Sequence, residues 1–118
     1  MLQIQKPEKT NLFITGIQNI AWEQVDQWSK VALYKVFREL MINMRKHSSA
    51  KLVTVKFSEA SNSLKIDYED NGIGASKEAL ILKNGLRNTE KRIKAIGGTI
   101  NFESEIGKGF RVLIHIPK

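Results

Sequence analysis

The segment Asp70-Asn71-Gly72-Ile73-Gly74 carries residue types that could bind a flat heterocyclic base. It follows a run of alternating apolar residues, so we expect Asp70 at the surface end of a strand. A carboxylate there can accept a hydrogen bond from an exocyclic amine, and glycines, which have no Cβ, let a ring lie directly against the backbone. Asp-Asn-Gly is also ordinary turn chemistry, so this segment alone leaves a nucleotide site and a plain turn as alternatives.

Four polar residues upstream, Glu39, Asn43, Lys46 and His47, fall on one stripe of a predicted helix. At about 100° per residue they lie within an arc of about 100° that borders the apolar face. Polar groups at such an edge lose water unless they have partners, and a bound polyphosphate with its metal ion would supply them. Alternatively, Lys46 and His47 complement the dipole of the helix C-terminus, and Glu39 and Asn43 are rim residues.

A third feature is Asn84-Gly85-Leu86, in which a glycine leads directly into a helical pattern. Backbone N–H groups at a helix start favour phosphate, although Gly85 would also serve a simple turn. The sequence has no G-x-x-x-x-G-K-[ST] segment, and Lys77 stands where a dinucleotide-binding fingerprint would have its third glycine.

The elements that would position these residues are predicted from hydrophobic periodicity. Three- and four-residue spacing of apolar residues predicts a helix, and period-two alternation predicts strands with one buried face. Together they predict an α+β fold, a two-layer α/β sandwich whose largely antiparallel sheet is covered by helices on one face. The predicted elements are an edge strand at 11–15 ended by Gly16, a short helix or ordered loop at 21–29, helices at 30–46 and 86–96, strands at 53–57, 64–68, 100–102 and 110–116, and turns at 59–62 and 107–109.

Composition limits the class of protein and its partners. A chain of 118 residues has room for one domain, so residues 1–118 are expected to form a single unit. The sequence has no cysteine, no signal peptide and no apolar run long enough to span a membrane, which predicts a soluble domain. The net charge of +7 favours an anionic partner, but Lys and Arg are spread along the chain, as on a solvated basic surface.

Three segments in order, 38–47, 70–74 and 84–88, followed by the stretches 96–99 and 107–109, resemble the catalytic and ATP-binding domain of sensor histidine kinases in the GHKL ATPase superfamily. The resemblance covers roughly residues 33–117 and is closest to the branch whose members often have N-x-x-K-H in the helix. It implies a Bergerat fold, in which ATP lies between the helical layer and a lid.

On the adenine side, the resemblance implies that Asp70 binds the exocyclic amine, while Gly72, Ile73 and Gly74 lie along the base. Phe110 stands where many relatives carry a small hydroxyl residue near the adenine, so a water-mediated contact would be missing.

On the phosphate side, the resemblance implies that Asn43 holds Mg²⁺ and that Lys46 and His47 contact the phosphates. Glu39 matches the family acid that positions water or the attacking group. Asn84, Gly85 and Leu86 would close on the phosphates, but this segment has one glycine fewer than usual, which weakens the expected grip. Ten residues separate Gly74 from Gly85, so the lid would be short and the nucleotide held weakly unless a partner domain covers it.

Neither histidine matches the family's phosphoacceptor, because His47 belongs to the nucleotide helix and His115 to the last strand. The chain is therefore expected to be a catalytic domain and not a complete kinase. With ATP and Mg²⁺ it would phosphorylate a histidine on a separate dimerisation domain, and a response regulator would then take the phosphate. The expected location is the cytoplasm, or the cytoplasmic end of a membrane-anchored sensor, with no nucleic acid and no direct membrane contact.

Three alternatives remain open. The chain could be a catalytically silent ATP-binding interaction module, or an anti-sigma-type protein serine kinase of the same superfamily. The basic charge also leaves a nucleic-acid binder, whose binding would depend steeply on salt and not on ATP.

Overall fold

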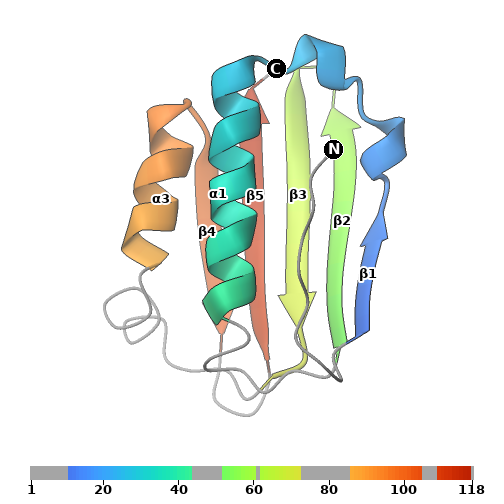
Figure 1. The fold of residues 1–118 in the computed structure, drawn as a ribbon, viewed down its shortest axis with the longest axis vertical. Helices are drawn as coiled ribbons and strands as arrows, with labels where there is room; N and C mark the ends of the chain where they lie inside the picture. Colours follow the sequence, from blue (N-terminus) through green and yellow to red (C-terminus); the bar gives the residue numbers. More distant parts are fainter. Residues whose placement is uncertain (1–10, 44–51, 61, 73–85, 105–108, 118) are drawn as a thin grey trace.

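The computed structural model describes residues 11–43, 52–60, 62–72, 86–104 and 109–117. Helices cover one face of a five-stranded sheet with the order β1-β2-β3-β5-β4 (Figure 1). This arrangement confirms the predicted two-layer α+β sandwich. The elements are β1 (Asn11–Thr15), the 3₁₀ turns η1 (Ile17–Asn19) and η2 (Trp22–Gln24), α1 (Gln27–Asn43), β2 (Leu52–Ala60), β3 (Ser63–Asp70), α3 (Leu86–Ala95), β4 (Thr99–Ser104) and β5 (Phe110–Pro117).

The sheet is mixed, as a parallel edge strand joins an antiparallel set. β1 pairs parallel with β2, whereas the pairs β2–β3, β3–β5 and β4–β5 are antiparallel. The register places Asp70 between Val53 of β2 and Phe110 of β5, so the end of β3 is held from both sides. The predicted edge strand and the four alternating strands are confirmed.

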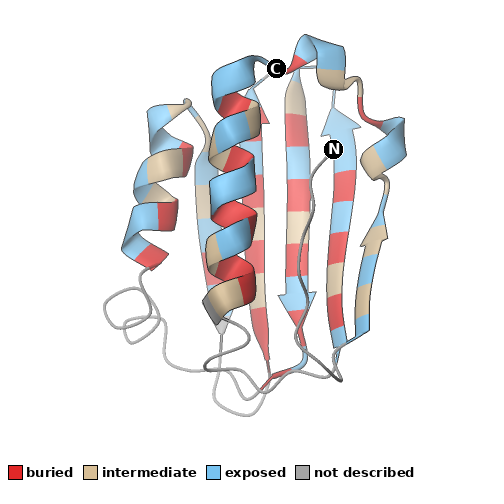
Figure 2. Ribbon diagram, in the orientation of Figure 1, coloured by how far each residue is buried: buried red, intermediate tan, exposed pale blue. Residues whose placement is uncertain are grey.

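The core lies between the helices and the covered face of the sheet. Buried residues on β2, β3 and β5 alternate with less buried ones (Figure 2), as period-two strands require. Burial of this apolar area is the main favourable contribution to folding. The fully buried residues of the core include Leu33, Val36, Val53, Leu64, Ile66, Tyr68, Leu86, Ile93, Val112 and Ile114.

Helix α1 begins three residues before the predicted start at Lys30, because Asp26 caps it. The Ser29 backbone N–H donates to Asp26 Oδ1 at 2.8 Å, and the Ser29 hydroxyl donates to Oδ2 at 3.2 Å. Such a cap satisfies an N–H group that has no partner within the helix. The segment predicted as a short helix or ordered loop, 21–29, is therefore the turn η2, the cap and the first residues of α1.

Helix α3 confirms the second predicted helix, and a glycine pair ends it. Gly97 has φ of +80°, its N–H donates to the Lys94 carbonyl at 3.0 Å, and the Gly98 N–H donates to the Ile93 carbonyl at 2.9 Å. This pair of bonds is a Schellman C-cap. The end of the predicted helix 30–46 and most of the turn 107–109 lie outside the described residues.

Candidate functional site

One end of the fold gathers the ends of several elements. Asn43 is the last residue of α1, Asp70 the last of β3, Leu86 the first of α3 and Phe110 the first of β5, and these ends lie at the lower end of the view in Figure 1. Residues far apart in sequence are thereby brought to one edge of the sandwich. Apart from Asn71, Gly72 and Gly109, most residues of the loops that adjoin these ends lie outside the described residues.

Asp70 is the best-defined side chain at this edge. It is only 7% exposed, accepts a hydrogen bond from the Tyr68 hydroxyl on Oδ2 at 2.9 Å, and accepts one from the Gly72 N–H on Oδ1 at 3.0 Å. The expectation of a surface position was wrong. Strand side chains alternate, so Asp70 shares the covered face with Tyr68, whereas Glu69 points to the other face.

Asn71, the residue after Asp70, is hydrogen-bonded to Leu52 at the start of β2. Its N–H donates to the Leu52 carbonyl at 3.1 Å, and its side-chain Oδ1 accepts from the Leu52 N–H at 2.9 Å. The Asn of Asp-Asn-Gly thus ties the end of β3 to the start of β2. The turn interpretation and the site interpretation of this segment are compatible. Asn71 bonds to the backbone of Leu52, while the Asp70 carboxylate is buried and accepts from the Gly72 N–H.

Tyr68 is fully buried, and its hydroxyl is held as a neutral donor. Burial raises the pKa of Tyr68 well above its ordinary value, and the negative charge of Asp70 and the hydrogen bond to it raise that pKa further. The ring makes an edge contact with Phe110 at a centroid distance of 6.1 Å, and Phe110 stacks on Phe102, also at 6.1 Å. The ring that carries the hydroxyl bonded to Asp70 is therefore part of a row of three aromatic rings.

Gly109 is required beside Asp70. It has φ of +85°, and a Cβ at this position would overlap the carbonyl oxygen of Asp70. Only glycine accepts both the left-handed backbone and this close approach without strain. Gly72 is also buried, and its predicted place along a base stays a prediction.

The other predicted site residues are described to different extents. Glu39 lies on α1 one turn before Asn43 and is partly exposed. Asn43 is placed by the backbone of α1, and its side chain, Lys46 and His47 lie outside the described part. Ile73, Gly74, Asn84 and Gly85 also lie outside it. His115 is exposed on β5.

Leu86 is fully buried at the start of α3. Its side chain belongs to the core, so any ligand contact at this position would come from its backbone.

The described residues offer few ligands for a metal ion. Within the described ranges, no three His, Cys, Asp or Glu residues lie close enough together to hold one. Mg²⁺ prefers oxygen ligands and usually keeps several waters while binding substrate phosphates. An amide oxygen, the type of ligand that an asparagine such as Asn43 carries, suits this mode of binding. Waters and the phosphates of the substrate supply the other ligands.

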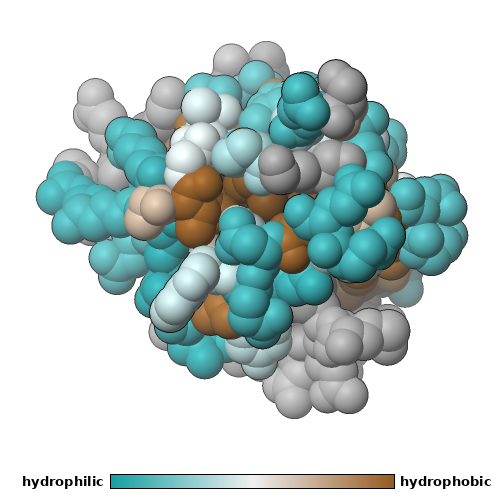
Figure 3. All heavy atoms as spheres, turned by 90° about the horizontal axis from the view of Figure 1, so that it is seen from above, coloured by the Kyte–Doolittle hydropathy of each residue, from teal (hydrophilic) through white to brown (hydrophobic). Residues whose placement is uncertain are grey.

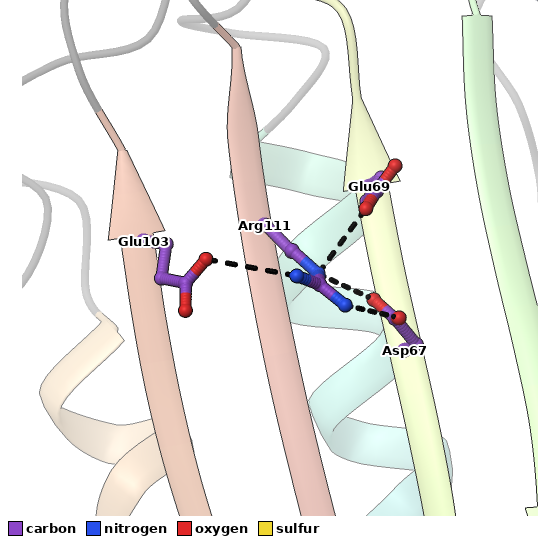
Figure 4. Close-up of polar contacts among 4 residues, drawn as sticks. All are labelled: Asp67, Glu69, Glu103 and Arg111. Atoms are coloured by element: carbon purple, nitrogen blue, oxygen red, sulfur yellow. Dashed lines mark hydrogen bonds and ion pairs between the residues drawn. The ribbon is translucent and has the colours of Figure 1, made fainter.

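Sequence reasoning missed two groups of side chains. The first is the Tyr68 hydroxyl, which the same-face spacing of Tyr68 and Asp70 could have revealed. The second is an ion-pair cluster around Arg111 on the face of the sheet away from the helices (Figure 4). Arg111 Nε and Nη2 donate to the Asp67 carboxylate at 3.0 and 2.7 Å, and Glu69 and Glu103 lie at 3.1 and 3.8 Å.

The Arg111 cluster links β3, β5 and β4 on the face of the sheet opposite to Asp70. Its carboxylates, Asp67 above all, raise the pKa of Arg111. Because Glu69 and Glu103 both face Arg111 in the register, the cluster joins β3, β5 and β4 one residue away from the Asp70–Phe110 pair.

An apolar hollow of about 630 Å³ lies elsewhere, between the first half of α1 and the turns η1 and η2. Ile17, Trp22, Val31 and Tyr34 are among its lining residues. It is near the end of α1 that begins at Gln27, the end viewed in Figure 3, where hydrophobic side chains show between hydrophilic ones. It is therefore separate from the edge that carries Asp70.

No helix among those described has the length and apolar content needed to traverse a lipid bilayer.

Known proteins are similar in sequence to most of this chain. The family model described as "Histidine kinase-, DNA gyrase B-, and HSP90-like ATPase" matches residues 29–118. The sensor histidine kinase ComP of Bacillus subtilis is 32% identical in an alignment over 95 residues that covers 78% of this chain and 12% of that protein. The signal transduction histidine-protein kinase/phosphatase DegS of the same species is 34% identical in an alignment over 92 residues that covers 75% of this chain and 24% of that protein. The chain thus spans less than a quarter of the length of these two relatives.

Solved structures have the same fold. The histidine kinase domain of a blue-light activated histidine kinase from Erythrobacter litoralis aligns with a TM-score of 0.71 and 20% identity, over 92% of this chain and 51% of that one. The ATP-binding domain of PrrB from Mycobacterium tuberculosis aligns with a TM-score of 0.63 and 23% identity, over 74% of this chain and 67% of that one.

Proposed function

This chain belongs to the family of histidine kinase-, DNA gyrase B- and HSP90-like ATPases, and from that premise we propose that it is the ATP- and Mg²⁺-binding catalytic domain of a two-component sensor histidine kinase. The observation that carries the proposal is the buried Asp70 carboxylate at the end of β3, oriented by Tyr68 and Gly72. The relatives named above, both histidine kinases, support the choice of kinase class.

Asp70 is the group proposed to recognise adenine. An ionised carboxylate has about four acceptor positions, so protein donors can orient it while an exocyclic amine donates as well. A buried carboxylate also discriminates strongly, because a base with a carbonyl oxygen in place of the amine would put two acceptors face to face.

The phosphates of ATP are proposed to be contacted by Lys46 and His47. Asn43 is proposed to provide an oxygen ligand for Mg²⁺. The metal, when bound, supplies charge neutralisation to the phosphates. The last turn of α1 starts at Glu39, so Glu39 and Asn43 lie one above the other on the helix, and Glu39 is proposed to position the attacking group. The backbone at Asn84, Gly85 and Leu86 is proposed to close on the phosphates.

The proposed reaction transfers the γ-phosphoryl group to a histidine of a separate dimerisation domain. A neutral imidazole nitrogen attacks phosphorus, the bond from phosphorus to the β–γ bridging oxygen breaks, and ADP leaves. A response regulator then receives the group from the phosphohistidine. The chain covers only a small part of its relatives, so a dimerisation domain elsewhere in the same sensor is the proposed partner, at the cytoplasmic side.

Titration calorimetry of the chain with ATP, ADP and GTP, each with and without Mg²⁺, tests the nucleotide site. We expect adenine-selective binding that strengthens with Mg²⁺. Asp70→Asn should keep the fold, because the Tyr68 hydroxyl can rotate to accept from the new amide while Gly72 donates to the remaining oxygen. It should weaken ATP binding by about tenfold or more, as expected for losing a hydrogen bond to a charged group.

Glu69→Gln is the matched control, because it removes the same charge one residue away on the other face of β3. It should leave ATP affinity unchanged. An Asp70→Asn variant that binds ATP as tightly as the parent would refute the proposed site.

The phosphoacceptor is tested with γ-labelled ATP and the dimerisation domain of the sensor that carries this chain. Acid-labile phosphate on that domain supports the histidine kinase. Acid-stable phosphate on a partner would instead indicate a serine kinase, and binding without any transfer would indicate a silent module.

A further inference from the structure

The Tyr68 hydroxyl donates a hydrogen bond to the Asp70 carboxylate from the same strand. The two residues lie next but one on β3 and share its covered face. Tyr68 has no exposed surface, and Asp70 is 7% exposed. A phenol this deeply buried loses hydration, and the 2.9 Å bond to Asp70 Oδ2 satisfies it.

The Tyr68 hydroxyl and the Gly72 N–H both help to set the direction of the carboxylate. Tyr68 holds Oδ2 and the Gly72 N–H holds Oδ1, so rotation about the last side-chain bond of Asp70 would break both bonds. A carboxylate in a largely buried position needs such donors to remain ionised, because burial by itself favours the protonated form. Tyr68 therefore contributes both to the orientation of Asp70 and to its ability to act as an acceptor.

The position of the hydroxyl is itself fixed by packing. The Tyr68 ring meets Phe110 edge-on at an interplanar angle of 65°, and Phe110 stacks on Phe102 at 12°. Phe110 pairs with Asp70 across β3 and β5, yet its side chain offers no hydroxyl. The hydroxyl that bonds to Asp70 therefore comes from Tyr68 on the same strand, β3, and not from Phe110, the residue opposite Asp70 on β5.

We propose that Tyr68 is a positioning residue for base selectivity, which acts by holding the Asp70 carboxylate in the direction that accepts the adenine amine. This inference rests on the proposed function. Tyr68 has no exposed surface, so it would act on the nucleotide only through Asp70, and its removal should affect the discrimination between bases more than the binding of ribose and phosphates.

The test compares ATP with inosine triphosphate, which carries an oxygen in place of the exocyclic amine. Titration calorimetry with Mg²⁺ is run on the parent, Tyr68→Phe and Asp70→Asn. We expect the parent to prefer ATP, and Tyr68→Phe to lower the ratio of the two affinities by about tenfold, mainly through weaker ATP binding. A residue that only filled the core would lower both affinities equally, and that result would overturn the proposal.

The outcomes separate this inference from the function on which it rests. A parent that does not prefer ATP over inosine triphosphate contradicts adenine recognition by Asp70 and with it the role of Tyr68. A parent that prefers ATP, with the preference lost in Asp70→Asn and fully kept in Tyr68→Phe, overturns only the role of Tyr68.

A second measurement covers the case in which Tyr68→Phe fails to fold. The Tyr34→Phe chain contains Tyr68 as its one tyrosine, so labelling it with 3-fluorotyrosine gives a single fluorine resonance. We expect ATP to shift this resonance more than inosine triphosphate does. Equal shifts with the two nucleotides would overturn the proposal.

Discussion

Replacing Gly109 by alanine should damage both the stability of the fold and the candidate site, because the new methyl group would overlap the Asp70 carbonyl oxygen. Gly97 provides a matched control. The two glycines have nearly the same backbone, with φ of +85° and +80°, but among the described residues a Cβ on Gly97 would meet only Pro117 Cγ at 3.5 Å, an ordinary contact.

The expected magnitudes follow from these surroundings. The left-handed backbone costs an alanine about 1–2 kcal/mol, and the reduced entropy of the unfolded chain offsets about 0.4–1 kcal/mol of this. Gly97→Ala should therefore lower the free energy of unfolding by about 1 kcal/mol. Gly109→Ala adds a steric overlap with backbone, for which about 1–3 kcal/mol is typical, so its loss should be about 3 kcal/mol.

Urea unfolding followed by tryptophan fluorescence measures both variants. With a slope of about 2 kcal/mol per molar urea, the midpoint should fall by about 1.5 M for Gly109→Ala and by about 0.5 M for Gly97→Ala. ATP binding should weaken in the first variant, since Asp70 must move, and stay unchanged in the second. Equal midpoint shifts in the two variants would refute the steric argument.

Three further outcomes are expected. The Thr89 hydroxyl is buried and has no partner among the described residues, so Thr89→Val should raise the free energy of unfolding by about 1 kcal/mol in the same urea assay. The folded chain holds the Tyr68 proton more tightly than the unfolded chain does, so stability should fall as pH rises above about 10. In Tyr34→Phe, phenolate absorbance should then appear only together with loss of the folded circular dichroism. In the Lys94–Glu90 pair at 3.0 Å, Lys94 is largely exposed and Glu90 partly exposed, so Lys94→Ala should change stability by less than about 0.5 kcal/mol, with no effect left in high salt.

The layers of the fold were predictable from the sequence because periodicity reports which side of each element is buried. Val53, Leu64 and Val112 each belong to a period-two run, and all three are fully buried on the covered face. The start of α1 was placed three residues late, because the prediction relied on apolar spacing and did not weigh Asp26 as a cap.

The local sequence also marked Asp70, but its surroundings depend on pairings that are distant in the chain. Alternation alone puts Tyr68 and Asp70 on one face, whereas the register of β5 brings Gly109 and Phe110 against them from about forty residues away. Only the tertiary structure shows Asp70 buried and bonded to the Tyr68 hydroxyl and the Gly72 N–H. Residue types and spacing therefore determined which chemistry was available to this chain, and the packing of β3 against β5 decided the orientation and burial of the carboxylate, because hydrogen bonds depend on distance and direction that sequence spacing does not specify.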